Sequence, residues 1–452
     1  MNSKQLVLDA IKLKEVERIP WVPFVGCHAA SLIGTDAERY FKSEDLIVSG
    51  VEKANEMYQP DGLPILFDLQ LEAEALGCSL KWAADNPPAV SSHPLAEGKT
   101  VADLRIPGPA EGRIPIAVNA TKRIVRSLGD RIALYGLITG PYTLALHPRG
   151  TKIFKDMLKN PEEAVRIMEF CRDVCVKMAE YYMEAGADVI AIVDPMVSQI
   201  SPKNFTDFVG PYCTDIYDVI RKAGKLCSLF VCGDATSNME VMCQTKPDNI
   251  SIDENIDLGY VKEIALKNGV SFGGNIRLTV TMLFGTVTDN IRDAMNCMEI
   301  GGRRGFILAP GCDMPFATPV KNVKAITSAV HGEIIDIVDD EDVMAGIEVT
   351  LPDYRNEKKV IIDVITLDSE CCAACQYMWE AVNRAIEIFG DKVTATEYSV
   401  KYKESVARMK KLGVVNVPAT CIDGDIVFIS KIPDIDTLRD VIRKYMAAKN
   451  LA

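Results

Sequence analysis

The sequence has little of what several classes of protein require. It contains only four histidines among 452 residues, and its formal net charge is −13. This acidic balance argues against a nucleic-acid surface, which needs clustered Lys and Arg. No apolar run reaches the length of a membrane span, and residues 1–20 lack the apolar stretch of a signal peptide. The 14 cysteines are therefore expected to be mostly reduced thiols in a cytoplasmic protein without membrane or nucleic-acid partners.

Between about residues 133 and 318, apolar runs alternate with segments of helical period. The strand candidates are "IALYGLI", "DVIAIVDP", "LCSLFVCGD", "NISID", "VSFGGNI" and "RGFILAPGC". The clearest helix is predicted at 161–185, with Asn160 as its N-cap and apolar residues at a period near 3.6. Such alternation is typical of a parallel sheet with helices between its strands.

Several of these strands end in a polar or reactive side chain, namely Asp194, Cys232, Asp253 and Cys312. We expect a (β/α)8 TIM-type barrel over residues 1–335, because the strand ends of such a barrel converge on its functional face. An open doubly wound sheet is the competing architecture. No Gly-rich dinucleotide fingerprint supports it.

A change of pattern follows the barrel. Residues 336–356 are acidic and predict a linker, and a small α/β domain is expected at 357–452. Its strands are predicted in "KKVIIDVITL" and "KVTATEYSV", and "VPATCIDGDIVFI" reads as a hairpin that turns at Asp423 and Gly424.

The small domain carries a Cys-x-x-Cys motif, Cys372 to Cys375, after a strand and at the start of a helix. A helix N-terminus stabilises a thiolate, and this spacing brings two sulfurs within disulfide reach. The unit resembles a thioredoxin-like domain of the small redox-disulfide type, and Val417-Pro418 stands where that family keeps a cis-proline. Cys371 extends the motif and leaves the identity of the nucleophile open. Inert thiols in a binding module are the alternative, and a zinc site is disfavoured because no second pair of ligands is present.

Cys232 and Cys312 differ from the other cysteines of the first domain because each ends a strand and precedes a turn. Two such thiols on one barrel face can bind a soft metal such as Zn²⁺. Residues two apart on a strand share a face, so a third ligand is expected at position 230, which is Phe230. The residues alone leave both a metal site and its absence open.

The first domain resembles the uroporphyrinogen decarboxylase superfamily, and more closely its cobamide-dependent methyltransferase branch. The matching stretches are "ERIPWVPF", "FDLQLEAEALGC", "ITGPYTLA", "GADVIAIVDP", "ISPKNF", "VCGD", "GGNIRLTVTMLFGT" and "LAPGCDMPFATPVKNVKAI". The resemblance implies a zinc ion held by a His-x-Cys pair and a distant Cys, which activates a thiol that accepts methyl from a corrinoid. Cys232 and Cys312 fill the two Cys positions, and Phe230 stands at the His position.

A zinc ion with two thiolates would need other ligands. The candidates are Asp234, Asp253, Glu72, Glu74, His28 and His147. No Asp-x-His-x-x-Gly motif occurs in the chain, so the corrinoid is expected from a separate corrinoid-binding protein, with a small methyl donor or thiol acceptor as the second substrate.

Decarboxylation of a porphyrinogen is a less favoured interpretation of this resemblance than methyl transfer. The decarboxylases hold substrate carboxylates with an arginine pair after the first strand, and "WVPFVGCHAASLIG" contains no Arg. Their active-site Asp has a counterpart in Asp68, and His147 stands at the position of their Tyr. Asp68 and His147 are therefore the candidate catalytic side chains.

Two hypotheses follow. In the first, the chain is a methyltransferase whose Cys-x-x-Cys domain is redox-active and keeps the barrel thiols reduced or delivers a thiol. In the second, the barrel has lost its zinc chemistry, and the chain is a non-catalytic redox or metal-handling protein.

Overall fold

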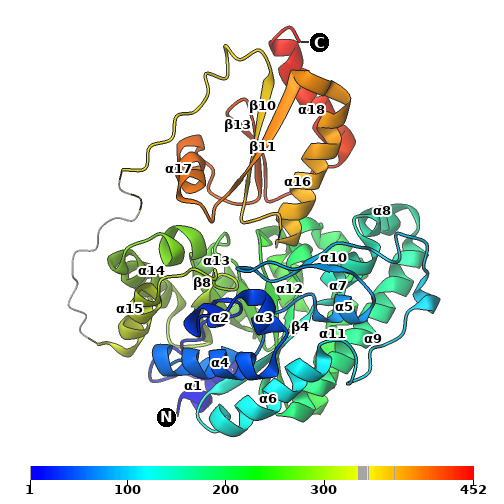
Figure 1. The fold of residues 1–452 in the computed structure, drawn as a ribbon. Helices are drawn as coiled ribbons and strands as arrows, with labels where there is room; N and C mark the ends of the chain where they lie inside the picture. The colour runs from blue at the N-terminus through cyan, green and yellow to red at the C-terminus, as the bar shows by residue number, and fades with distance from the viewer. Residues whose placement is uncertain (1, 334–343, 345, 371, 452) are drawn as a thin grey trace. The chain divides into compact units, whose positions relative to one another are not determined.

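The computed structural model describes residues 2–333, 344, 346–370 and 372–451. The chain forms two compact units, Met1–Asp340 and Glu341–Ala452 (Figure 1). The predicted linker at 336–356 falls partly outside the described residues, so its boundaries stay a prediction. Within the described part, no helix is both long and apolar enough to cross a membrane.

The first unit is built on a curled sheet of seven parallel strands in the order β1-β4-β5-β6-β7-β8-β9. The strands are β1 (Gly62–Pro64), β4 (Ala133–Thr139), β5 (Val189–Val193), β6 (Leu226–Val231), β7 (Asn249–Ile252), β8 (Ser271–Ile276) and β9 (Phe306–Pro310). All six predicted strands are confirmed. The three-residue β1 was not predicted, because so short a run carries no periodic signal.

The segment around Trp21 takes the place of an eighth strand. Trp21 forms a parallel bridge with Leu308 of β9, and its carbonyl accepts a hydrogen bond of 2.8 Å from the backbone N–H of Asp61, next to β1. The two edges of the sheet are thereby joined through one segment. The predicted barrel is confirmed, with an irregular piece of chain where a regular strand was expected.

Helices follow the strands and surround the sheet (Figure 1). They are α1 (Ser3–Ile11), α2 (His28–Leu32), α3 (Ala37–Phe41), α4 (Glu44–Tyr58), α5 (Leu71–Ala75), α6 (Ile114–Leu128), α7 (Pro141–Arg149), α8 (Lys152–Lys159), α9 (Pro161–Ala185), α10 (Pro202–Phe208), α11 (Gly210–Lys222), α12 (Met239–Gln244), α13 (Leu258–Lys267), α14 (Val287–Gly301) and α15 (Val320–His331). A short hairpin of β2 (Leu80–Lys81) and β3 (Ala89–Val90) lies outside the main sheet.

The predicted helix at 161–185 is observed as α9, and Asn160 takes the predicted N-cap position but without a side-chain cap. The side chain of Asn160 makes no capping hydrogen bond, and its backbone (φ −145°, ψ 62°) is not extended as an N-cap requires. Asn160 also ends the preceding helix α8, and this double role sets its conformation. The helix instead begins with Pro161, whose missing N–H costs nothing in the first turn.

The second unit has a four-stranded sheet in the order β11-β10-β12-β13, with β10 parallel to β11 and antiparallel to β12. Its elements are β10 (Val360–Thr366), α16 (Ala373–Ile386), β11 (Val393–Ser399), α17 (Lys403–Leu412), β12 (Ala419–Ile422), β13 (Asp425–Ile429) and α18 (Ile435–Ala448). The predicted elements are confirmed, including the hairpin turn, and the Val417–Pro418 peptide is cis. Apolar side chains from β10, α16 and α18 form its core.

Candidate functional site

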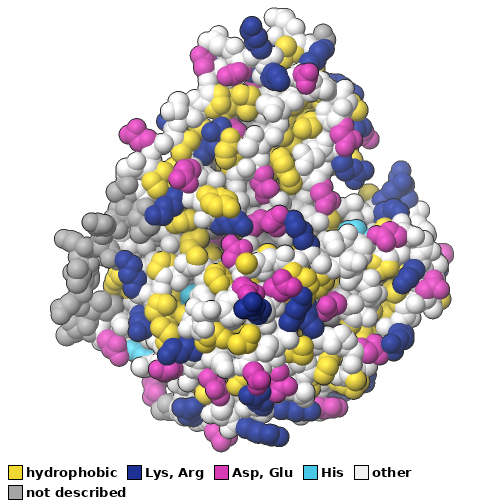
Figure 2. Space-filling model, viewed as in Figure 1, with side chains coloured by type: hydrophobic (Ala, Val, Ile, Leu, Met, Phe, Trp, Pro, Cys, Tyr) yellow, Lys and Arg dark blue, Asp and Glu magenta, His cyan; other side chains and the backbone are white. Residues whose placement is uncertain are grey.

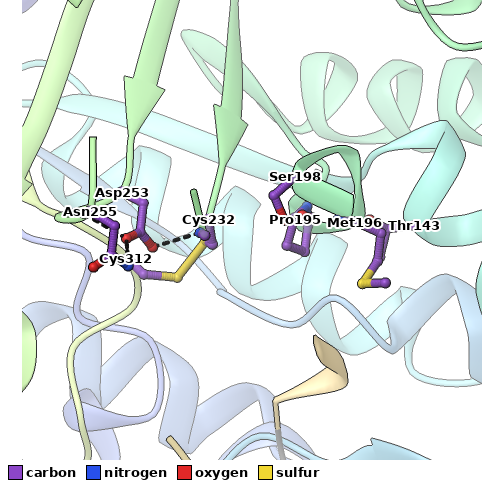
Figure 3. Close-up of a disulfide and its surroundings, with 9 residues drawn as sticks. Thr143, Pro195, Met196, Ser198, Cys232, Asp253, Asn255 and Cys312 are labelled. Atoms are coloured by element: carbon purple, nitrogen blue, oxygen red, sulfur yellow. Dashed lines mark hydrogen bonds between the residues drawn. A yellow bond between two sulfur atoms is a disulfide. The ribbon is translucent and has the colours of Figure 1, made fainter. Parts of the chain in front are cut away.

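Cys232 and Cys312 meet at the carboxyl ends of the barrel strands. Cys232 directly follows β6, Cys312 comes two residues after β9, and their Cα atoms are 6.0 Å apart with the sulfurs joined in a disulfide. Figure 3 shows this bond beyond the tips of the strands. Both side chains are partly exposed rather than packed into the interior. The structure therefore brings the two thiols together, as the strand-end argument predicts.

The turn after Cys232 depends on Gly233 and Asp253. Gly233 has φ +84°, and a Cβ there would lie 3.0 Å from the hydroxyl of Ser198, so glycine is required on both counts. Its backbone N–H donates to the carboxylate of Asp253 at 2.7 Å, and the other oxygen of Asp253 accepts from Asn255 (Figure 3). Asp253 directly follows β7, so neighbouring strands fix the position of Cys232.

The loop after Cys312 is held by the segment that precedes α2. The backbone N–H of Met314 donates to the carbonyl of Phe24 at 2.9 Å. The Nδ1 atom of His28 lies 3.0 Å from the carbonyl of Phe316, and its Nε2 atom lies 2.7 Å from the hydroxyl of Tyr58. Burial lowers the pKa of His28 to about 4, so its ring is neutral, with Nδ1–H donating to the carbonyl and Nε2 accepting from the hydroxyl. His28 is therefore committed to the loop and is not free to bind a metal.

Three carboxyl groups beside the cysteine pair are held toward their neutral forms. Burial, followed by the charge of a neighbouring acid, raises the pKa of Asp253 and Glu254, and burial raises the pKa of Asp313 well above its ordinary value. One oxygen of Asp313 is buried without a hydrogen-bond partner, and a Cβ on Gly26 would lie 2.0 Å from it.

Phe230 fills the position where the resemblance implies a histidine. It is 1% exposed, and its ring centroid lies 4.9 Å from that of Phe24 and 5.9 Å from that of Phe67. These three rings belong to the apolar core inside the barrel, against which Cys232 and Cys312 also pack. An aromatic cluster therefore lies beneath the two sulfurs where the resemblance implies a third ligand.

The donor set does not fit a tetrahedral zinc site. Among the described residues, no group of three or more His, Cys, Asp or Glu side chains is placed to share a metal ion. The four carboxylates considered as substitutes accept hydrogen bonds elsewhere: Asp234 from Thr236, Asp253 from Gly233, Glu72 from the backbone N–H of Thr139 and Glu74 from Arg113. The two cysteines are thus left as a pair of sulfurs.

The two predicted catalytic residues, Asp68 and His147, are both buried. Asp68 forms a buried ion pair with Arg113 and accepts a hydrogen bond of 2.9 Å from the backbone of Gln70. His147 lies inside α7, where burial lowers its pKa to about 3, and its carbonyl lies 2.6 Å from Nδ1 of His93. Their catalytic roles stay predictions.

Sequence reasoning did not find Arg113, Glu254 and Asp313. Arg113 is 45 residues from Asp68 along the chain, and no local pattern pairs them. Glu254 and Asp313 directly follow Asp253 and Cys312, which the strand-end pattern identified. Extending that pattern by one position would have found both.

In the second unit, the Cys-x-x-Cys motif has one accessible and one buried sulfur. Cys372 is the N-cap of α16, partly exposed, and its sulfur accepts a hydrogen bond of 3.3 Å from the backbone N–H of Cys375. Cys375 is fully buried, its sulfur accepts from the N–H of Leu367, and burial raises its pKa well above the ordinary value. Cys371 lies outside the described residues.

The uroporphyrinogen decarboxylase family profile matches residues 2–333, and a thioredoxin domain profile matches residues 360–443. The chain belongs to the uroporphyrinogen decarboxylase family. Its relatives within this family include enzymes of two named activities.

The methylcobamide:CoM methyltransferase MtbA of Methanosarcina acetivorans is 26% identical over 332 residues, which cover 72% of this chain and 96% of that protein. A uroporphyrinogen decarboxylase of Anaeromyxobacter sp. (strain Fw109-5) is 25% identical over 343 residues, covering 72% of this chain and 97% of its own. The solved structure of a methyltransferase from Methanosarcina mazei superposes with a TM-score of 0.68 at 24% identity, covering 74% of this chain and 99% of that one. This last likeness shows the barrel fold.

Proposed function

We propose that the barrel transfers a methyl group between a corrinoid, carried by a separate corrinoid-binding protein, and a small thiol or methylated donor. The observation that carries this proposal is the pair of partly exposed sulfurs at the carboxyl ends of β6 and β9, in a barrel similar to methylcobamide:CoM methyltransferases. The C-terminal unit supplies a second activity, thiol–disulfide exchange, through Cys372 and Cys375. The many buried free cysteines support a reducing, cytoplasmic location.

The chemistry of the transfer requires a deprotonated acceptor sulfur. A carbon–sulfur bond forms as the carbon–cobalt bond breaks, and the bonding electron pair stays with the corrinoid. The proton of the acceptor thiol is assigned to Asp253, which accepts a hydrogen bond from the backbone N–H of Gly233, the residue after Cys232, and whose pKa is raised by burial. The described residues do not supply a zinc site, so no step is assigned to that metal.

Porphyrinogen decarboxylation has less support. Figure 2 shows acidic and basic side chains interspersed over the drawn face rather than a basic patch. Arg18, just before the first strand-like segment, is bound to the carboxylate of Asp61 by two hydrogen bonds of 2.6 Å. It is therefore not available to hold a substrate carboxylate.

Methylcobalamin demethylation tests the proposal. Fully reduced protein is mixed with methylcobalamin and a panel of small thiols, and the methylated products are identified by mass spectrometry. Activity should fall by about 100-fold or more in Cys232→Ser and Cys312→Ser. It should persist in Cys243→Ala, a matched control at a buried cysteine of α12. Full activity in both serine variants would remove the pair from the reaction.

The second candidate is a redox protein on a barrel without methyl chemistry, and the burial of Phe230 at the third ligand position favours it. It predicts no demethylation with any thiol, although the cysteine pair still cycles between dithiol and disulfide. The assay above, combined with a thiol count, separates the two candidates.

A further inference from the structure

We propose that Cys232 and Cys312 form a redox-active dithiol–disulfide couple whose electron donor is the Cys372–Cys375 dithiol of the same polypeptide or of a second copy. This inference deepens the proposed function, because it assigns a redox activity to the site where the methyl group is transferred. It concerns the chemistry of the two pairs and requires no fixed arrangement of the two units.

The first support is the geometry of the barrel pair. A Cα–Cα distance of 6.0 Å lies within the range that a disulfide spans, and the loops that carry the two sulfurs are fixed by hydrogen bonds from separate elements. The pair is partly exposed, and no third donor among residues 2–333 converts it into a metal site. Two adjacent thiols without a metal can close into a disulfide and be released from it by thiol–disulfide exchange.

The second support is that the exposure of the cysteines selects which sulfurs can take part in exchange. Among the described cysteines, all are buried except Cys232, Cys312 and Cys372. Thiol–disulfide exchange needs access to the attacked sulfur as well as a thiolate. Among the cysteines that the structure describes, the fold therefore leaves one accessible attacking sulfur in the C-terminal unit and one accessible disulfide in the barrel, and it shields the other thiols.

The third support is the different exposure of the two cysteines of the Cys-x-x-Cys motif. Cys372 is exposed enough to attack, and the N–H of Cys375 and the start of α16 face its sulfur. Cys375 is buried next to it and has a raised pKa, so it is protonated until a mixed disulfide forms. This arrangement suits an attacking sulfur followed by a resolving one.

The exchange balances as a two-electron transfer. The Cys372 thiolate attacks one sulfur of the Cys232–Cys312 disulfide and forms a mixed disulfide, releasing the other barrel sulfur as a thiolate. Cys375, on losing its proton, then attacks Cys372 and releases the second barrel sulfur. Two electrons and two protons have moved from the Cys372–Cys375 dithiol to the Cys232–Cys312 disulfide. A further turnover needs an external dithiol reductant to regenerate the Cys372–Cys375 pair.

The test uses the full chain and follows the barrel disulfide directly. Protein oxidised with diamide is treated with limiting dithiothreitol, quenched with N-ethylmaleimide at successive times, and mapped by mass spectrometry. In Cys372→Ser the barrel disulfide should be reduced about ten-fold more slowly or worse, because only direct reduction remains. In Cys421→Ala, a matched control at a buried cysteine of the same unit, the rate should equal that of the parent. Equal rates in Cys372→Ser and the parent would overturn the proposal.

A second variant keeps the test decisive if Cys372→Ser folds poorly. Cys375→Ser lacks the resolving sulfur and should accumulate a mixed disulfide that links Cys372 to Cys232 or Cys312, seen as a cross-linked peptide pair. Absence of this species under conditions that oxidise Cys372 would overturn the proposal. So would about one zinc per reduced chain that is lost in Cys232→Ser. Methyl transfer by Cys372→Ser in excess reductant is independent of the exchange, so failure of the two proposals can be told apart.

Discussion

At the scale of single residues, the identity of position 230 decides what the barrel pair can do. A phenyl ring at this position packs with two others and offers no electron pair to a metal. A histidine at the same position would lie on the strand face that leads to Cys232 and would add an imidazole to the two thiols.

We predict that Phe230→His raises the zinc content of the reduced protein from well below one to about one per chain, because a third donor completes the set. Without metal this variant should be less stable by about 2 kcal/mol, since a polar ring replaces a phenyl group in an apolar cluster. Elemental analysis after dialysis measures the first effect, with Phe230→Leu as the control. Equal zinc contents in the two variants would contradict the account.

Glu72 is a buried acid whose pKa is raised by burial. The hydroxyl of Thr139 has one proton but lies 2.8 Å from the carbonyl of Leu69 and 2.7 Å from Glu72. A protonated Glu72 can donate to the hydroxyl, which then donates to the carbonyl. Burial raises the pKa of Glu72 from 4.5 to about 7, in agreement with this pattern.

Because the folded state binds this proton more tightly than the unfolded state, its contribution to stability is complete below pH 4.5 and is lost as the pH rises through about 7. Glu72→Gln preserves the shape and the donor. Its stability relative to the parent should therefore increase by up to about 3 kcal/mol between pH 4.5 and pH 8. Denaturant unfolding at several pH values measures the difference, and a difference that does not vary with pH would contradict the raised pKa.

At the scale of elements, the loops after β7 and β9 determine how the sulfurs meet. A Cβ on Gly311 would lie 2.5 Å from the backbone nitrogen of Glu254, which cannot rotate away as a side chain can. These two loops follow strands that are not neighbours in the sequence, so their contact could not be predicted from local patterns.

We predict that Gly311→Ala lowers stability by about 1–3 kcal/mol and slows formation of the Cys232–Cys312 disulfide. The matched control is Gly108→Ala, where the new Cβ would be 3.2 Å from the flexible carboxylate of Glu111. Thermal unfolding and diamide oxidation followed by mass spectrometry measure the two effects. Parent-like behaviour of Gly311→Ala in both measurements would show that this contact does not hold the pair.

The two cysteines at the N-terminus of α16 should differ in their reactivity toward alkylating reagents. Iodoacetamide should modify Cys372 about 100-fold faster than Cys375 at neutral pH, because burial shields Cys375 and raises its pKa. Timed alkylation with peptide mapping gives both rates, and buried Cys421 serves as an internal reference for full protection. Comparable rates at Cys372 and Cys375 would contradict the assignment of attacking and resolving sulfurs.

At the scale of the whole molecule, the sequence predicted most of the fold and part of the site. Regular strands, α9 and the elements of the C-terminal unit follow from periodicity, and the meeting of Cys232 with Cys312 follows from the geometry of parallel strands. Asn160 takes the predicted N-cap position but makes no side-chain cap, because the same residue ends α8 and begins α9. The packing of Phe230 and the ion pair of Asp68 depend on residues distant in sequence, and no short pattern specifies them.

The central claim is that the free thiols of Cys232 and Cys312 serve methyl transfer. The most direct test is the rate of methylcobalamin demethylation by the parent protein, measured with its barrel pair oxidised and again with it reduced, the state in each case mapped by mass spectrometry. The account predicts demethylation with the dithiol, none with the disulfide, and recovery on reduction. Equal rates in the two states would contradict it.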